Sequence, residues 1–185
     1  WNGGAVTTPT GGGNAAAYAT WNTGGATSND QWLITPQIMN IQTGDELKFW
    51  LRLPGYTNAY DEALDILVST TGTATANFTT QVALLTWTAG FTDTNWTERT
   101  YVLSNFVPAG SNIYIAFREH VLDNVNDGSA ILLDLISVRS IVPVELVSFN
   151  ANVSDKNVQL SWVTATEVNN RGFEVQRMLG EEFTT

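Results

Sequence analysis

The segment Glu46-Leu47-Lys48-Phe49-Trp50-Leu51-Arg52-Leu53 places leucine or phenylalanine at every second position. A period of two puts successive side chains on opposite faces, which predicts a β-strand with one face in a core. The same spacing recurs further along the chain, in Leu64, Ile66 and Val68, in Val82 and Leu84, and in Ile113, Ile115 and Phe117. The stretch Ile131 to Val138 is apolar on both faces, which predicts a central strand. Gly- and Pro-containing turns separate these runs, so we expect an all-β, two-sheet antiparallel sandwich.

The composition excludes several classes of function. The 185 residues include 18 acidic and 8 basic side chains, a formal net charge of -10, and no cysteine. Nucleic acid is not an expected partner, because binding its backbone needs clustered Lys and Arg. Without cysteine the chain can hold no disulfide, no iron–sulfur cluster and no thiol nucleophile. No apolar run approaches the roughly 18 residues of a membrane span, so we expect no membrane insertion.

A domain boundary is predicted near residues 141–143. We expect one β domain over residues 1–141 and an incomplete β module over residues 142–185. The second part holds three further predicted strands, Val144 to Val153, Val158 to Val163 and Phe173 to Met178. A complete sandwich module uses about seven strands. Three strands leave an open sheet edge, which can pair with another chain, so homo-oligomerisation through that edge is one expectation.

Five segments of the first part occur in a characteristic order along the chain. They are Asp30 to Pro36, Leu47 to Trp50, Leu67 to Gly72, Ile113 to Glu119 and Leu132 to Val138. Together they resemble the cleaved-adhesin (choice-of-anchor J) family of secreted bacterial surface proteins. The chain departs from that family at Leu135, where a second acid is usual. The Asp-Gly-Asp-type segment found near the start of the family is either missing or lies upstream of Trp1.

The resemblance implies a jelly-roll sandwich that acts as a non-catalytic adhesin or carbohydrate-binding-like module. The partners it implies are a glycan or a host or matrix protein. The later segments Pro143 to Phe149, Val158 to Trp162 and Gly172 to Arg177 resemble the opening of a fibronectin type III-like module. Such a module often precedes a sorting domain, which implies type IX secretion to the outer surface of a Bacteroidetes-like bacterium.

Two other functions stay open on the sequence alone. The chain can be a structural subunit of a surface filament or layer, because an open sheet edge invites strand addition. It can also be an ancillary domain of a secreted hydrolase whose catalytic part lies outside these residues. Catalysis within the chain itself is not expected. His120 is the only histidine, and neither a triad, a conventional zinc site nor a Gly-x-Ser-x-Gly elbow is suggested.

Asp134 is the position where a charge is hardest to accommodate, because it lies within the apolar run Leu132 to Ile136. An unpaired buried carboxylate is strongly destabilising. Either Arg118 or loop amides compensate it, or it binds structural calcium, as the family resemblance implies. Glu62 matches an acid common in that family. Asp134 and Glu62 are therefore the predicted metal ligands, and Ca²⁺ is the predicted cofactor.

Aromatic side chains near loops suggest a place for sugar contacts. Tyr56 and Tyr60 bracket Asn58 in a polar loop. Aromatic rings stack on sugar faces while amides bind hydroxyl groups, so these three residues are the predicted ligand contacts. The alternative is that the loop aromatics cover sheet edges and the bases of loops.

Overall fold

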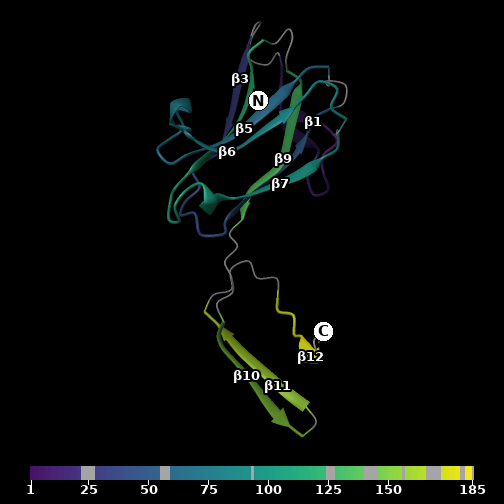
Figure 1. The fold of residues 1–185 in the computed structure, drawn as a ribbon, viewed down its shortest axis with the longest axis vertical. Helices are drawn as coiled ribbons and strands as arrows, with labels where there is room; N and C mark the ends of the chain where they lie inside the picture. Colours follow the sequence, from purple (N-terminus) through teal and green to yellow (C-terminus); the bar gives the residue numbers. More distant parts are fainter. Residues whose placement is uncertain are drawn as a thin grey trace. The chain divides into compact units, whose positions relative to one another are not determined.

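Antiparallel strands of the first 140 residues form two sheets (Figure 1). One sheet contains, in spatial order, β1 (Asn2–Ala5), β2 (Ala15–Thr20), β9 (Ala130–Arg139), β4 (Glu46–Arg52) and β7 (Thr97–Val102). The other contains β3 (Asn29–Ile34), β8 (Tyr114–Val121), β5 (Glu62–Ser69) and β6 (Thr80–Trp87). Among the described residues the helical elements are two 3₁₀ turns, η2 (Thr75–Asn77) and η3 (Leu103–Asn105).

The computed structural model describes residues 1–21, 28–54, 59–92, 94–123, 128–139, 146–155, 157–165, 172–179 and 182–184. The chain divides into two compact units, Trp1–Ser140 and Ile141–Thr185. Over the described ranges, no helix has the length and apolar character needed to cross a membrane.

The core of the first unit lies between the two sheets. Leu47, Phe49 and Leu51 of β4 are almost fully buried, as the period of two predicts. Phe49 meets Phe117 of β8 edge to face, with ring centroids 5.0 Å apart and planes at 82°. Because these rings come from different sheets, they join the two inner faces. The predicted all-β, two-sheet antiparallel sandwich of the jelly-roll class is therefore confirmed.

The alternation predicted for β6 is wrong at Leu84, which is 52% exposed. Ile66 of β5 pairs with Ala83 of β6, but the next residue, Leu67, pairs with Gln81. Val82 is the extra residue of this β-bulge, and it shifts the inward face by one position. Beyond the bulge the partly buried residues that pack on the core are Ala83, Leu85 and Trp87.

Strand β9 occupies the middle of the five-stranded sheet, as its continuous apolar pattern predicts. Ile131, Leu132 and Leu133 are all buried, so both faces of this half of the strand are covered. The ladder between β9 and β4 is interrupted by a register shift between Lys48 and Trp50. Next to this irregularity Leu135 adopts a φ of 50°, a left-handed conformation that is costly for a leucine. Asp134 therefore lies where the strand departs from regular geometry.

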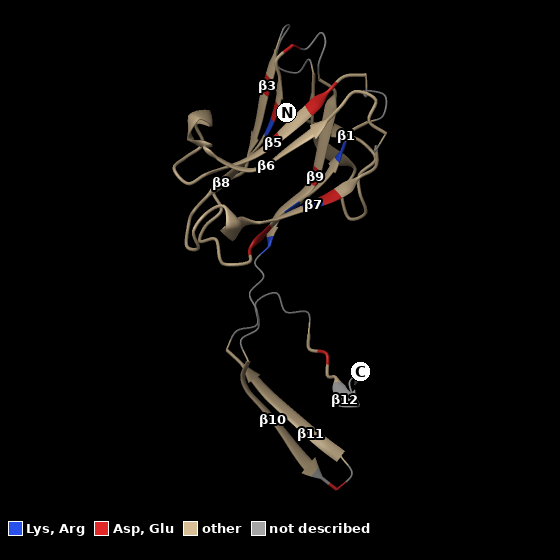
Figure 2. Cartoon of the chain, viewed as in Figure 1, with Lys and Arg blue, Asp and Glu red and all other residues tan. Residues whose placement is uncertain are grey.

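Charged side chains are sparse, and Figure 2 shows the Lys and Arg positions of the described strands scattered over both sheets. Lys48 pairs with Glu46 at 3.6 Å, and Arg118 pairs with Asp30 at 2.7 Å. These are the ion pairs found within the described ranges.

The second unit contains the hairpin of β10 (Leu146–Ser154) and β11 (Asn157–Thr164). It also contains the short pair β12 (Arg177–Leu179) and β13 (Glu182–Thr184). Trp162 contacts Phe173, with ring centroids 5.4 Å apart. The strand predicted from Phe173 to Met178 is wrong over its first part, because residues 173–176 form no ladder. Phe149, Val153 and Val158 remain exposed, since a two-stranded hairpin has no opposing sheet. The fibronectin type III-like resemblance stays a prediction.

Candidate functional site

One end of the sandwich interior is polar. Asn29 of β3, Glu62 of β5, Glu119 of β8 and Ser129, which precedes β9, are each at most 4% exposed. The alternation of the strands explains this placement, because Glu62 lies two residues before Leu64 and Glu119 lies two residues after Phe117. The two carboxylates thus continue rows of inward-facing apolar side chains. We call this group of four residues the acidic end of the core.

Both carboxylate oxygens of Glu62 accept backbone hydrogen bonds. Ala63 N donates to Oε1 at 2.8 Å, and Ser129 N donates to Oε2 at 2.7 Å. Burial nevertheless raises the pKa of Glu62 from its ordinary value of 4.5 to about 7, because desolvation outweighs the two amide donors. The segment before β9 therefore holds Glu62 in place through Ser129.

Glu119 is less well satisfied than Glu62. Its Oε2 accepts a short hydrogen bond from Asn29 Nδ2, while its Oε1 is buried and has no partner among the described residues. Burial, and then the charge of Glu62, raise the pKa of Glu119 to about 8. Like charges that share a buried site disfavour joint ionisation. This oxygen is the least compensated polar atom of the acidic end.

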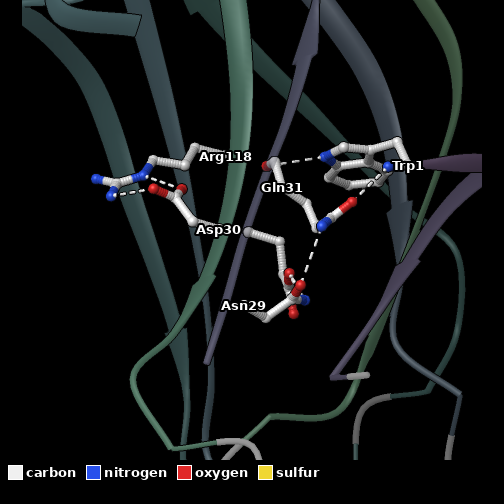
Figure 3. Close-up of polar contacts among 6 residues, drawn as sticks. Trp1, Asn29, Asp30, Gln31 and Arg118 are labelled. Carbon is white, nitrogen blue, oxygen red and sulfur yellow. Dashed lines mark hydrogen bonds and ion pairs between the residues drawn. The ribbon is translucent and has the colours of Figure 1, made fainter. Parts of the chain in front are cut away.

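A chain of polar contacts leads from Asn29 to Trp1 (Figure 3). Gln31 Nε2 donates to Asn29 Oδ1 at 3.0 Å, and the backbone nitrogen of Trp1 donates to Gln31 Oε1 at 2.9 Å. Trp1 Nε1 donates to the carbonyl oxygen of Gln31 at 3.1 Å. Asn29 Nδ2 also donates to the carbonyl oxygen of Thr20 at 2.9 Å. These bonds fix the amide of Asn29 and, through it, the carboxylate of Glu119.

The opposite face of the same strands carries an ion pair (Figure 3). Arg118 Nε and Nη2 donate to the two carboxylate oxygens of Asp30 at 2.7 and 3.0 Å. The guanidinium also stacks on the Trp32 ring, 4.9 Å from its centroid. The suggested pairing of Arg118 with Asp134 is therefore wrong, since Arg118 is committed to Asp30 on the four-stranded sheet.

Asp134 lies on β9 of the other sheet, apart from the acidic end. Its Oδ1 accepts a hydrogen bond from Leu135 N at 2.7 Å, while Oδ2 is buried without a partner in the described part of the chain. The backbone of Gly12 lies so close to this oxygen that a Cβ at that position would clash with it. Asp134 and Glu62 are thus on different sheets, and the described contacts do not bring them together.

A pocket of about 340 Å³ opens beside Glu62. The ladder between β5 and β8 ends at Leu64 and Glu119, and beyond this pair the strands separate. The segment starting at Gly128 fills part of the gap, where Gly128 N donates to the carbonyl oxygen of Asp61 at 2.8 Å. The pocket is lined by Asp61, Glu62, Ala63, Thr86, Trp87, Thr88, His120, Val121, Leu122 and Gly128. It therefore joins the acidic end of the core to the surface.

Of the predicted sugar contacts, Tyr60 lies next to this pocket in the sequence. Tyr60 is 42% exposed and precedes Asp61, which lines the pocket. Tyr56 and Asn58 lie outside the described residues. Asp61 Oδ1 accepts a hydrogen bond from Ala89 N at 2.7 Å, which ties the loop before β5 to the turn after β6. His120 lines the pocket from the end of β8.

Sequence reasoning missed Asn29 and Glu119. A signal existed in the alternation, because Glu119 has the same parity as Ile115 and Phe117. The burial of Asn29 and Ser129 depends on contacts between distant segments, which the sequence pattern does not contain.

A family model described as the Cleaved Adhesin Domain matches residues 2–138. The chain belongs to this family. Among solved structures, it is similar to the K1 cleaved adhesin domain of Lys-gingipain from Porphyromonas gingivalis, at 27% identity and a TM-score of 0.54. That match covers 70% of this chain and 76% of the other. The K3 domain of the same protein shares the fold, at 24% identity and a TM-score of 0.52, covering 69% of this chain and 74% of that one. A comparison with curated proteins gives no match.

Proposed function

We propose that this chain is a non-catalytic, adhesin-type binding module of a secreted or surface-exposed bacterial protein. Membership of the cleaved adhesin family supports the class of function. The observation that carries the proposal is the pocket where β5 and β8 separate, because it is a concave site at a loop-rich end of the sandwich.

The ligand that fits the pocket is a glycan. Trp87 offers an aromatic wall, Thr86 and Thr88 offer hydroxyl groups, and Asp61 offers a carboxylate at the rim. Aromatic surfaces stack on sugar rings, and short polar side chains bind their hydroxyl groups. Tyr60 is exposed one residue away and extends the aromatic surface. A host or matrix protein is the alternative partner.

A glycan array and a panel of matrix proteins, both run with calcium, test the proposal. Tyr60→Ala and His120→Ala are expected to weaken binding of any retained ligand at least several-fold. Met39→Ala serves as the matched control, because Met39 is exposed next to the Ile38–Ile113 bridge at the opposite end of β8. Equal loss in the control, or silence across both panels, would overturn the assigned site.

Calcium is the ion that the family resemblance implies. Ca²⁺ takes oxygen ligands in flexible geometry. Asp134 offers a buried oxygen without a described partner, whereas both oxygens of Glu62 accept backbone N–H groups. A single ion held by both residues does not fit their positions on different sheets. To hold an ion, Asp134 and Glu62 would each need further oxygen ligands from their own surroundings.

Self-association is a second candidate function, favoured by the exposed apolar hairpin of β10 and β11. Phe149 and Val153 lie on the same face of β10 and are exposed. Such a surface is a candidate for pairing with a second copy. Mass photometry at rising concentration is expected to detect oligomers of the full chain, and Phe149→Ser with Val153→Ser is expected to abolish them. Asn152→Ser, on the other face of the strand, is the control.

A further inference from the structure

The five-stranded sheet has an unpaired margin along the second half of β9. β2 pairs with β9 only from Leu133 to Ala130, whereas β4 pairs with it as far as Arg139. On the side away from β4, residues 136–139 therefore have no neighbouring strand in the described part of the chain. We call this stretch the β9 margin. The backbone N–H and C=O groups along such a margin are a template for an extended segment of another chain.

An apolar pocket of about 400 Å³ opens between the two sheets beside the β9 margin. Its lining includes Leu47 and Ile115, whose side chains are fully buried. Ile136 and Val138 of β9 line it from one sheet, and Ile38 lines it from the other. None of the residues that line this pocket carries a charge. An extended segment added along the β9 margin would direct every second side chain toward the pocket.

The other side of the pocket is less suited to strand addition. It is formed by the continuation of β3, which passes through Pro36, a residue without an N–H group. The amides on either side of this proline are used within the sheet. Thr35 N donates to the carbonyl oxygen of Ile115 at 2.9 Å, and Ile38 N donates to that of Ile113 at 2.8 Å. An added strand therefore gains its backbone hydrogen bonds at the β9 margin.

The hairpin of β10 and β11 has the complementary deficiency, because it lacks an opposing sheet. One face of its ladder is apolar and is formed by the pairs Phe149–Trp162, Ala151–Leu160 and Val153–Val158. The positions between them carry uncharged polar side chains, namely Asn150, Asn152, Gln159 and Ser161. Val153 is 78% exposed and Val158 is 61% exposed. One apolar and one polar face is the pattern of a strand pair at the surface of a sandwich.

We propose that the β10–β11 hairpin of a second copy of this chain adds to the β9 margin. β10 pairs with residues 136–139, and the apolar face of the hairpin is directed toward Leu47 and Ile115 in the pocket. The inference rests on the self-association proposed above and names the surface that receives the hairpin. Because donor and acceptor are different surfaces, the contact is head to tail, and each copy accepts one neighbour while it donates to another.

Sedimentation velocity of the full chain over a rising concentration series tests the inference. The wild-type protein is expected to form dimers and longer assemblies, and added NaCl is expected to favour them, because each copy carries a net charge of -10. Hydrogen–deuterium exchange is expected to slow at residues 136–139 and in β10 as the assemblies form. A wild-type chain that stays monomeric would overturn this inference together with the self-association on which it rests. Slow exchange of both segments in a monomer would place the hairpin on its own sandwich and exclude the second copy.

A variant of the pocket identifies the acceptor. Val138→Lys places a charge at the β9 margin and is expected to weaken association at least tenfold, since its ammonium group would have to be desolvated. Thr100→Lys is the matched control, because it adds the same charge at an exposed position of β7, the opposite margin of the same sheet. Thermal melting checks that both variants fold. If Val138→Lys does not fold, the wild-type protein decides: exchange at residues 136–139 that is unchanged in the oligomer overturns the inference.

Mixing two variants tests the head-to-tail arrangement. Phe149→Ser combined with Val153→Ser removes the donor and keeps the acceptor, whereas Val138→Lys removes the acceptor and keeps the donor. Each variant alone is expected to be monomeric, and their equimolar mixture is expected to form a 1:1 dimer and nothing larger. If Val138→Lys associates as strongly as the wild type, or the mixture stays monomeric, the hairpin pairs with a different surface. Self-association of the wild type would then stand, and this inference alone would be wrong.

Discussion

The inner face of β8 is apolar at one end and acidic at the other. Ile115 and Phe117 are fully buried against apolar neighbours, and two residues further on Glu119 is equally buried against Asn29 and near Glu62. One alternating pattern therefore places both apolar side chains and carboxyl groups in the interior. Burial in this sandwich is therefore set by strand geometry, whereas the contribution of a buried group to stability depends on what it contacts.

The largest effect is expected from a substitution at the apolar end of β8. Phe117→Ala removes a fully buried ring and its edge-to-face contact with Phe49. We expect a loss of about 3–5 kcal/mol in the free energy of unfolding, since core Phe→Ala changes leave a cavity. Urea unfolding followed by tryptophan fluorescence measures it. Ile115→Val, which removes one methyl group from the same face, should cost only about 1 kcal/mol.

The second effect is a pH dependence of the free energy of unfolding, which the two glutamates of the acidic end cause. The folded-state pKa values of Glu62 and Glu119 are raised to about 7 and about 8, above their ordinary 4.5. The folded protein therefore holds protons that the unfolded chain has already released. The contribution of these two protonated carboxyl groups to the free energy of unfolding is fully present below pH 4.5. It is lost as the pH rises through 7 and 8. We expect the free energy of unfolding to fall by several kcal/mol over this interval.

Urea midpoints at a series of pH values measure this slope. Glu119→Gln should flatten it, because one of the two coupled carboxyls no longer titrates. A midpoint that rises steadily across the same interval would contradict the burial of these groups.

A third and smaller effect concerns the bulge in β6. Leu85 packs against the core and Leu84 faces solvent, although the simple alternation predicted the reverse. We expect Leu85→Ala to cost about 1–2 kcal/mol and Leu84→Ala no more than about 0.5 kcal/mol. Chemical denaturation of the two variants side by side provides the comparison. Equal losses would place the extra residue elsewhere in the strand.

The smallest effect is expected on the outward face of β8. Asp30→Asn breaks the ion pair with Arg118, but the Asp30 side chain is 48% exposed and solvent screens the interaction. We expect a change of about 0.5 kcal/mol, well below the effect at Phe117 on the inward face. High salt should reduce the wild-type advantage further, which a repeat of the urea titration would measure.

The sequence predicts the regular strands well and the irregular positions poorly. Leu47, Phe49 and Leu51 have the predicted orientation because β4 pairs in regular register with β7, and the extra residue of its irregular ladder with β9 lies on β9. Leu84 does not, since the bulge at Val82 arises from the pairing with β5. Glu62 was recognised as noteworthy through family resemblance. Its neighbour Glu119 was not, because only the register between β5 and β8 brings the two together.

The bulge in β6 has a consequence at the border of the sandwich. β6 is the outermost strand of its sheet, and Val82 interrupts the even spacing of its backbone groups. A foreign strand aligned along this margin cannot match donors and acceptors over the full length, and local twisting turns the margin away. Lateral stacking into amyloid-like ribbons is therefore discouraged on this side. Growth of the sheet by strand addition along β6 is therefore disfavoured.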